Sequence, residues 1–339
     1  MAAMRLMEVN MQETLKLVTQ VFGVSGNEDE IREVITNEIK KHVDEIRVDA
    51  MGNLIAIKKG KKKKIMLAAH MDEIGVIATF IDDKGFIRFS NLGGVSSFTS
   101  LGQRVKFRNG TIGTVNAEEK LEDMKGLKLG KMYIDIGCKN REEAEKLVRV
   151  GDTANFAGDF VIQGNYAISK AMDDRSGCAV LIELIKALPK TDNEIYFVFT
   201  TQEELGLRGA KTAAFGIMPD CAVAIDVTLT GDTPESNSRE VKLGGGPAIK
   251  VKDSAYIANP TIRRTLEELA ADNSIPYTLE LLDRGGSDPG AIQTTGVGVP
   301  CGGISIPCRS VHSPSEMVCL EDLENCVKLT ALFIKNYKG

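Results

Sequence analysis

The sequence of 339 residues contains no tryptophan, and aromatic residues make up only 5% of it. Enzymes that cleave polysaccharides usually line their clefts with aromatic side chains, so this scarcity argues against a glycoside hydrolase. A surplus of basic residues is also missing, because 47 acidic residues outnumber 42 basic ones and give a net charge of −5. Nucleic-acid-binding proteins normally carry a basic surplus, and we therefore expect no nucleic-acid partner.

Long apolar runs, an export signal and paired cysteines are absent as well. No apolar stretch approaches the ~20 residues that a membrane span needs, and residues 1–6 lack the hydrophobic segment of a secretory signal. The seven cysteines are odd in number, and none shows the C-x2-C spacing of a zinc site, which is typical of reduced thiols. These absences predict a cytoplasmic protein with no membrane partner.

The order of the predicted elements indicates an α/β protein with an inserted β-rich segment. Helical spacing of apolar residues predicts helices over 11–18, 176–188, 260–273 and 321–337, and apolar runs predict strands that include 65–69, 194–200 and 221–225. From Val76 to about Gly164, short alternating runs broken by turns predict a small all-β domain, with a strand at 160–162 and one short helix at 141–148. We therefore expect a discontinuous catalytic domain, at 1–75 and 164–339, around an inserted domain at 76–163.

Histidine is scarce, and two of the three histidines lie close to acidic residues. His70 and Asp72 are two residues apart, directly after a predicted strand, and this spacing places both side chains on one face of an extended chain. His70 can then bind a metal ion through one ring nitrogen while Asp72 accepts a hydrogen bond from the other and fixes the ring. The alternative is a histidine–aspartate pair that merely ends a strand.

Two pairs of adjacent acids stand next to apolar segments. Asp173 and Asp174 precede a predicted helix, where a carboxylate either caps the helix or bridges two cations. Glu203 and Glu204 follow a predicted buried strand, and acids close to a core are costly unless they are paired or coordinated. Because adjacent side chains point in different directions, one can bind a metal ion while the other faces a bound water. The alternative for the glutamate pair is a solvated turn.

Asp226 ends the apolar run 221–225, and His312 lies in a loop rich in serine and proline. Each residue alone is typical of a turn or loop, but in open α/β sheets ligands bind outside the carboxyl ends of the parallel strands, where these groups would meet. Two divalent ions bring four positive charges. Four negative charges balance them, one each from Asp173, Asp226, Glu204 and a bridging hydroxide. The two imidazoles add ligands without charge. Such nitrogen and oxygen ligands suit zinc, cobalt or manganese better than calcium or magnesium. The combination predicts a hydrolase with two divalent metal ions.

These segments resemble those of the co-catalytic two-metal aminopeptidases. At residues 202–210, 285–288 and 310–313 the resemblance narrows to metallopeptidase family 42, the tetrahedral, glutamyl or deblocking aminopeptidases, some of which are labelled cellulase or endoglucanase. It covers almost the whole chain. It implies an α/β fold with a mixed sheet flanked by helices, and an inserted small β-barrel domain used for dimer contacts.

The resemblance also implies a ligand set. One metal ion would be held by His70, Asp173 and Asp226, and the other by Asp173, Glu204 and His312, so that Asp173 bridges the two. The implied cofactors are two divalent metal ions per subunit, with zinc or cobalt favoured and manganese possible.

By the same resemblance, Glu203 would be the general base and Asp72 would orient the ring of His70. The implied reaction removes the N-terminal residue from short peptides by attack of a metal-bridging hydroxide. The implied partners are further copies of the chain, which form dimers and a tetrahedral dodecamer.

Two alternatives stay open at this point. One is a glycoside hydrolase with a cellulase-type label. The other is a different metal-dependent amide hydrolase, such as a carboxypeptidase or an aminoacylase, in which Arg175 or Arg284 would hold a free carboxylate. The preference for the side chain at the N-terminus of the substrate is not readable from the sequence.

Overall fold

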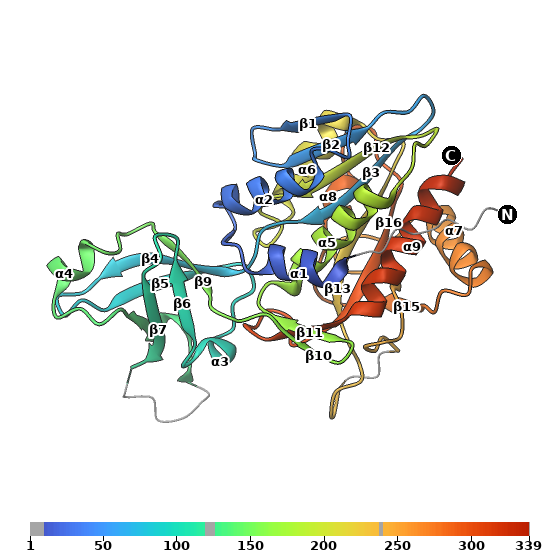
Figure 1. Cartoon of the computed structure of the whole chain (residues 1–339). Helices are drawn as coiled ribbons and strands as arrows, with labels where there is room; N and C mark the ends of the chain where they lie inside the picture. The colour runs from blue at the N-terminus through green and yellow to red at the C-terminus, as the bar shows by residue number, and fades with distance from the viewer. Residues whose placement is uncertain (1–9, 119–125, 237–239, 339) are drawn as a thin grey trace.

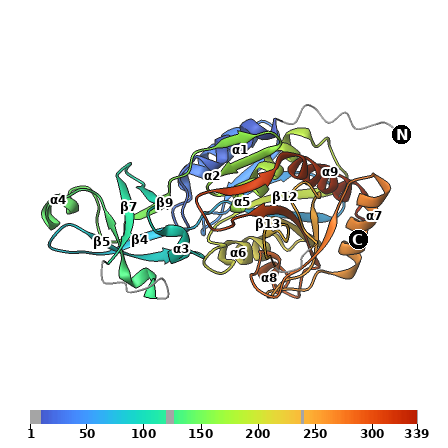
Figure 2. The same cartoon turned by 90° about the horizontal axis from the view of Figure 1, so that it is seen from below.

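The computed structural model describes residues 10–118, 126–236 and 240–338. A large α/β part holds both ends of the described chain, and a small β-barrel projects from one side of it (Figures 1 and 2). The predicted fold class is confirmed, because one large mixed sheet is flanked by helices and a separate set of strands closes into a barrel.

Among the described residues, the large sheet has eleven strands. Nine of them follow the order β1-β2-β12-β3-β13-β16-β17-β11-β10, and β14 pairs with both β15 and β16. Four neighbours in its centre, β12, β3, β13 and β16, run parallel to one another. The strands are β1 (Glu45–Val48), β2 (Leu54–Lys58), β3 (Lys64–His70), β10 (Val161–Gln163), β11 (Tyr166–Ser169), β12 (Glu194–Thr200), β13 (Cys221–Leu229), β14 (Ala248–Lys252), β15 (Thr278–Leu281), β16 (Cys301–Arg309) and β17 (Glu316–Cys319).

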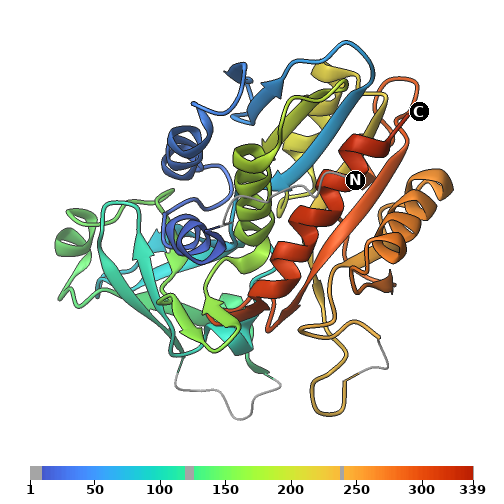
Figure 3. The ribbon, with the colours of Figure 1, turned by 45° about the vertical axis from the view of Figure 1, so that its right-hand side comes forward.

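Helices cover both faces of this sheet, which explains why its central strands are continuous apolar runs buried on both sides. One face packs against α1 (Met11–Thr19), α2 (Asp29–Ile39), α5 (Met172–Ala187), α7 (Pro260–Asp272) and α9 (Leu320–Asn336). Figure 3 shows α5 and α9 crossing this face side by side. The other face packs against α6 (Arg208–Ile217) and α8 (Pro289–Ile292). The helices predicted at the start of the chain, at 260–273 and at 321–337 are confirmed as α1, α7 and α9.

The barrel closes in the order β4-β5-β8-β7-β6-β9 around an apolar core of its own. Its strands are β4 (Gly75–Ile81), β5 (Ile87–Leu92), β6 (Arg104–Phe107), β7 (Ile112–Ala117), β8 (Met132–Asp135) and β9 (Thr153–Phe156), and its short helical segments are α3 (Ser97–Ser100), η2 (Leu129–Lys131) and α4 (Arg141–Glu145). The chain enters at β4 and leaves at β9. These two strands are paired, with Gly75 opposite Asn155.

The strand predicted at 160–162 is present as β10, but it pairs with β11 of the large sheet and not with a barrel strand. The reason is a tight turn at Gly164 and Asn165, which joins Gln163 to its opposite residue Tyr166. Gly164 has a φ of 61°, in the left-handed region that two-residue hairpin turns require. Residues 161–163 therefore belong to the large sheet.

All seven cysteines are free, and six of them are buried, while Cys138 in the barrel is partly exposed. In the described ranges, no helix is both long and apolar enough to cross a membrane.

The side chain of Asn53 forms hydrogen bonds that hold the segment connecting β12 to α6 in place. It is fully buried, and its Oδ1 accepts a hydrogen bond from the backbone N–H of Thr201 at 3.0 Å. Its Nδ2 donates to the carbonyl oxygen of Gly209 at 2.9 Å and to Asp49 Oδ2 at 2.7 Å. One amide therefore holds both ends of the segment 201–209.

We predict that Asn53→Leu lowers the free energy of unfolding by about 1–3 kcal/mol, because it leaves the buried backbone N–H of Thr201 without its acceptor. Chemical denaturation followed by circular dichroism measures this change. The exposed Asn273, whose side chain bonds to the Leu269 carbonyl of α7, provides the control, and Asn273→Ala is expected to change stability by less than about 0.5 kcal/mol. An Asn53→Leu protein as stable as the control contradicts the assignment.

Candidate metal centre

The predicted site residues meet at one edge of the large sheet because its central strands are parallel. His70 is the last residue of β3 and lies opposite Thr200, the last residue of β12, so that Glu203 and Glu204 follow just beyond this edge. Asp226 lies on the neighbouring strand β13. Ligands of α/β sheets bind at this edge, outside the carboxyl ends of the strands.

The sequence suggested that Asp226 ends its strand, but in the structure Asp226 lies inside β13. β13 continues to Leu229 because Val227 and Thr228 pair with Ile306 and Pro307 of β16. The carboxylate therefore projects from the face of the sheet and not from a turn. Its position on a paired strand holds it more firmly than a turn would.

The first group of side chains surrounds His70. Its Nε2 lies 2.9 Å from Asp173 Oδ1, 3.8 Å from Asp226 Oδ1 and 3.9 Å from Glu203 Oε2. The imidazole is only 2% exposed. One imidazole nitrogen thus faces three carboxylates from three different segments of the chain.

The second group surrounds His312, in the loop between β16 and β17. Its Nε2 lies 3.2 Å from Asp173 Oδ2 and 3.1 Å from Glu204 Oε1. The two oxygens of Asp173 therefore face two different imidazoles, one at 2.9 Å and the other at 3.2 Å. A carboxylate in this position is suited to bridging two cations.

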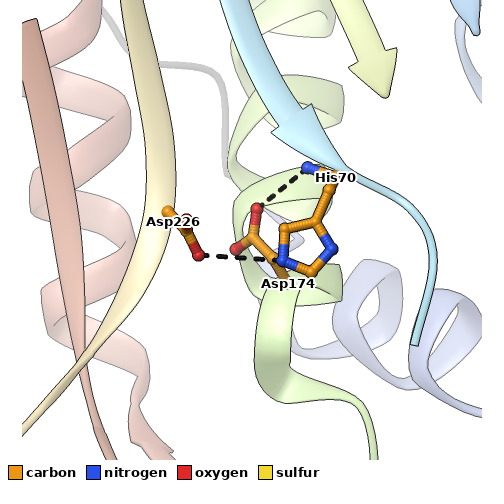
Figure 4. A group of neighbouring side chains, drawn as sticks. All are labelled: His70, Asp174 and Asp226. Atoms are coloured by element: carbon orange, nitrogen blue, oxygen red, sulfur yellow. Dashed lines mark hydrogen bonds and ion pairs between the residues drawn. The ribbon is translucent and has the colours of Figure 1, made fainter. Parts of the chain in front are cut away.

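Asp174 contributes to the same cluster in a different way (Figure 4). Its Oδ2 accepts a hydrogen bond from the backbone N–H of His70 at 3.2 Å. Its Oδ1 accepts one from the backbone N–H of Gly177 at 3.0 Å. Possible ligand atoms of His70, Asp174 and Asp226 lie within 4.8 Å of one another. Because both oxygens of Asp174 already accept backbone hydrogen bonds, this residue fits the role of a helix cap, while Asp173 faces the imidazoles.

The cluster concentrates negative charge at a largely buried position. Burial raises the pKa of Asp226 to about 7 and that of Glu203 well above its usual range. Burial lowers the pKa of His312, but the attraction of its protonated ring to the carboxylates of Asp173 and Glu204 is stronger and raises this pKa to about 12. Buried carboxylates in this number require bound protons or metal cations as compensation.

The donor atoms of the cluster fit divalent transition metals. Glu204 Oε1 is buried and, within the described part of the chain, accepts no hydrogen bond although it lies 3.1 Å from His312 Nε2. A buried carboxylate oxygen is costly unless a proton or a cation compensates its charge. Imidazole nitrogens combined with carboxylate oxygens are ligands that zinc, cobalt and manganese accept.

Asp72 holds the loop as well as the ring of His70. Its backbone oxygen lies 3.1 Å from His70 Nδ1, and its carboxylate Oδ1 lies at 3.5 Å from the same atom. The carboxylate also accepts hydrogen bonds from the backbone N–H groups of Glu203 at 3.0 Å and Glu204 at 3.3 Å, and from Ser25 Oγ at 2.6 Å. One buried side chain thus fixes two of the acidic residues of the centre.

Glu316 was not predicted to belong to the site, although it stands only four residues after His312. Its side chain is 2% exposed. Its Oε2 accepts a hydrogen bond from the backbone N–H of Asp173 at 3.0 Å, and its Oε1 accepts one from His312 at 2.6 Å. The signal that could have revealed it is a glutamate at the first position of an otherwise apolar strand, β17.

The fold and the cluster together define a hydrolase of the metallopeptidase class. The sequence profile described as M42 glutamyl aminopeptidase matches residues 52–329, and the chain belongs to this family of peptidases. It is therefore an aminopeptidase, and its family implies divalent metal ions.

Individual relatives agree over nearly the whole chain. A putative aminopeptidase of Acetivibrio thermocellus is 65% identical over 322 residues, which cover 95% of this chain and 98% of the relative. An aminopeptidase structure from the archaeon Desulfurococcus kamchatkensis superimposes with a TM-score of 0.93 at 41% identity, covering 96% of this chain and 95% of that one.

Two further structures bear on assembly and on the carbohydrate alternative. The TET1 peptidase of Pyrococcus horikoshii, described as assembling into a tetrahedron or a large octahedral shell, has a TM-score of 0.88 at 36% identity and covers 97% of this chain and 100% of that one. A Thermotoga maritima protein named an endoglucanase has a TM-score of 0.82 at 34% identity and covers 96% and 97%.

Glu316→Ala is predicted to weaken the centre without removing a metal ligand. The change leaves the buried N–H groups of Asp173 and His312 without an acceptor, at a cost of about 1–3 kcal/mol each, and frees both side chains to move. We expect a lower melting temperature and weaker binding of divalent cations, measured by calorimetric titration. Glu145→Ala, at an exposed position of the barrel, is the control and should leave both quantities unchanged. Unchanged cation affinity in Glu316→Ala would contradict the prediction.

Proposed function

We propose that this aminopeptidase uses two divalent metal ions to remove the N-terminal residue from short peptides. His70, Asp173 and Asp226 hold one ion, and Asp173, Glu204 and His312 hold the other. The observation that supports this assignment is the position of Asp173, whose two carboxylate oxygens lie 2.9 and 3.2 Å from the Nε2 atoms of the two histidines. Zinc or cobalt fits the ligand set, and manganese is an acceptable substitute.

The bound cations supply an activated water near neutral pH and a Lewis acid for the scissile carbonyl. Glu203 is the general base in this proposal, and its carboxylate accepts the proton of the attacking water and returns it to the leaving amine. Its Oε2 faces the cluster, 3.9 Å from His70 Nε2, and its backbone is held by Asp72. Asp72 is a positioning residue, because it touches the ring of His70 and the loop of Glu203 and not the reacting atoms.

The structure weakens the alternative of a carboxypeptidase or an aminoacylase. Such an enzyme needs a cation to hold a free carboxylate, and Arg175 was one of two candidates. Arg175 is fully buried, and its guanidinium donates hydrogen bonds to the carbonyl oxygens of Met71 and Val18 at 2.7 and 2.6 Å. Arg284, which is exposed, is the remaining candidate.

We also propose that the barrel makes dimer contacts and that dimers assemble into a tetrahedral dodecamer in the cytoplasm. The shell described for the Pyrococcus horikoshii relative supports the assembly, and the seven free cysteines agree with a reducing compartment.

Hydrolysis of a panel of aminoacyl anilides tests the activity directly. We expect cleavage of substrates with a free amino terminus, complete loss of activity with a chelator, and recovery on addition of zinc, cobalt or manganese. The N-acetylated forms of the same substrates and cellulose are the controls, and neither should be cleaved. Equal rates on acetylated substrates, or reducing sugar released from cellulose, would overturn the proposal.

We predict that Glu203→Gln lowers turnover by about 10²- to 10⁴-fold, the usual contribution of a general base, while the metal content is retained. Steady-state kinetics and elemental analysis measure the two quantities. Glu194→Gln, at the opposite end of β12, is the matched control and should keep both at the level of the unchanged protein. Near-normal turnover of Glu203→Gln would show that another group takes the proton.

A further inference from the structure

A loop of the barrel reaches back to the metal centre. It joins β5 to α3 and contains Gly93 and Gly94, which lie against two proposed metal ligands from the large α/β part. The backbone N–H of Gly94 points to Glu204 Oε2 at 3.4 Å. Just after the loop, in α3, the hydroxyl of Thr99 lies within donating distance of two carbonyl oxygens, that of Ser96 at 3.3 Å and that of His312 at 3.4 Å.

At Gly94 the structure leaves no room for a side chain. A Cβ atom at this position would lie 2.2 Å from Nδ1 and 2.4 Å from Cε1 of the His312 ring. At Gly93, whose φ is 80°, a Cβ atom would lie 2.8 Å from Glu204 Oε2. The loop backbone therefore packs directly against both side chains.

The contact with His312 falls on the edge of the ring that faces away from the cluster. Nε2 faces Asp173 and Glu204, while Nδ1 and Cε1 face Gly94. The backbone of His312 is held separately, since its N–H bonds to Glu316. Because the backbone is fixed on one side and the ring is blocked on the other, the imidazole has little freedom to turn away from Asp173.

We propose that Gly94 is a positioning residue of the metal centre, through which the barrel holds the His312 ring and the Glu204 carboxylate in place for the second cation. The inference rests on the proposed ligand set. It adds that the barrel is a structural part of the centre and that the absence of a side chain at residue 94 strengthens the binding of the second cation.

Gly94→Ala tests the inference, because its single added carbon must displace the ring or the loop. The full-length protein is stripped with a chelator and titrated with Co²⁺, and binding is followed by calorimetry and by the visible absorption of the ion. We expect the second Co²⁺ to bind about 10- to 100-fold more weakly, the usual effect of a change behind a metal ligand, while the first binds as before. Gly130→Ala, in the same barrel, is the matched control, since among the described residues no atom other than those of its chain neighbours lies within 4 Å of the added Cβ.

Thermal unfolding of the metal-free protein will show whether Gly94→Ala folds. If it does not fold, a second variant provides the test. Thr99→Val has nearly the same shape as threonine but loses the hydrogen bond to the His312 carbonyl. We expect it to weaken the second Co²⁺ about two- to fivefold, in line with the loss of a weak hydrogen bond. Unchanged Co²⁺ binding in every folded variant of the loop overturns the inference.

His312→Ala separates this inference from the proposed function. If His312→Ala binds Co²⁺ like the unchanged protein, the ligand set itself is wrong. If His312→Ala loses the second ion while Gly94→Ala and Thr99→Val keep it, the ligand set stands and the role of the barrel loop is wrong. Loss of the second ion in His312→Ala together with its weakening in the loop variants supports both.

Discussion

The structure is organised around one carboxylate that lies between two imidazoles. Asp173 stands at the start of α5, and its two oxygens face a histidine from the end of β3 and a histidine from the loop after β16. This arrangement is possible only because β3, β13 and β16 are parallel and adjacent, so that their carboxyl ends reach the same edge. The register of the central strands thus brings several carboxylates together at a buried site, where their negative charges are unfavourable without compensation. The proposed cations provide that compensation.

A set of buried acids supports the centre without binding metal in our assignment. Asp72, Asp174 and Glu316 each accept hydrogen bonds from backbone N–H groups of the segments that carry the proposed ligands. A carboxylate that accepts such bonds fixes a loop more firmly than an apolar contact, because the bonds are directional and lie in a buried, weakly screening environment. The sequence pattern alone does not distinguish these acids from ligands, since both kinds are aspartates and glutamates within or next to apolar segments, and only the family resemblance separated Asp72 from the ligand set.

Much of the fold was predictable because its signals are local. The apolar run that ends at His70 predicts a buried strand, and helical spacing predicts α7 and α9. The pairing partners were less predictable. β10 joins the large sheet because of a turn at Gly164, and β13 extends past Asp226 because β16 lies beside it, and neither partner is evident from nearby residues. The structure does bring His70, Asp173, Glu204, Asp226 and His312 together, and their roles as ligands stay predictions. Glu316 was missed because its role depends on two backbone groups from distant segments.

The paired strands β4 and β9 place the entry and exit of the barrel side by side, with Gly75 opposite Asn155. An inserted domain whose two ends lie side by side hardly disturbs the sheet that carries it. The amino-acid sequence of the barrel surface can therefore change, or the barrel can be exchanged for that of a related protein. The backbone contact of Gly94 limits this freedom at one point. A chimaera that transplants the barrel should therefore keep its β5–α3 loop from the host.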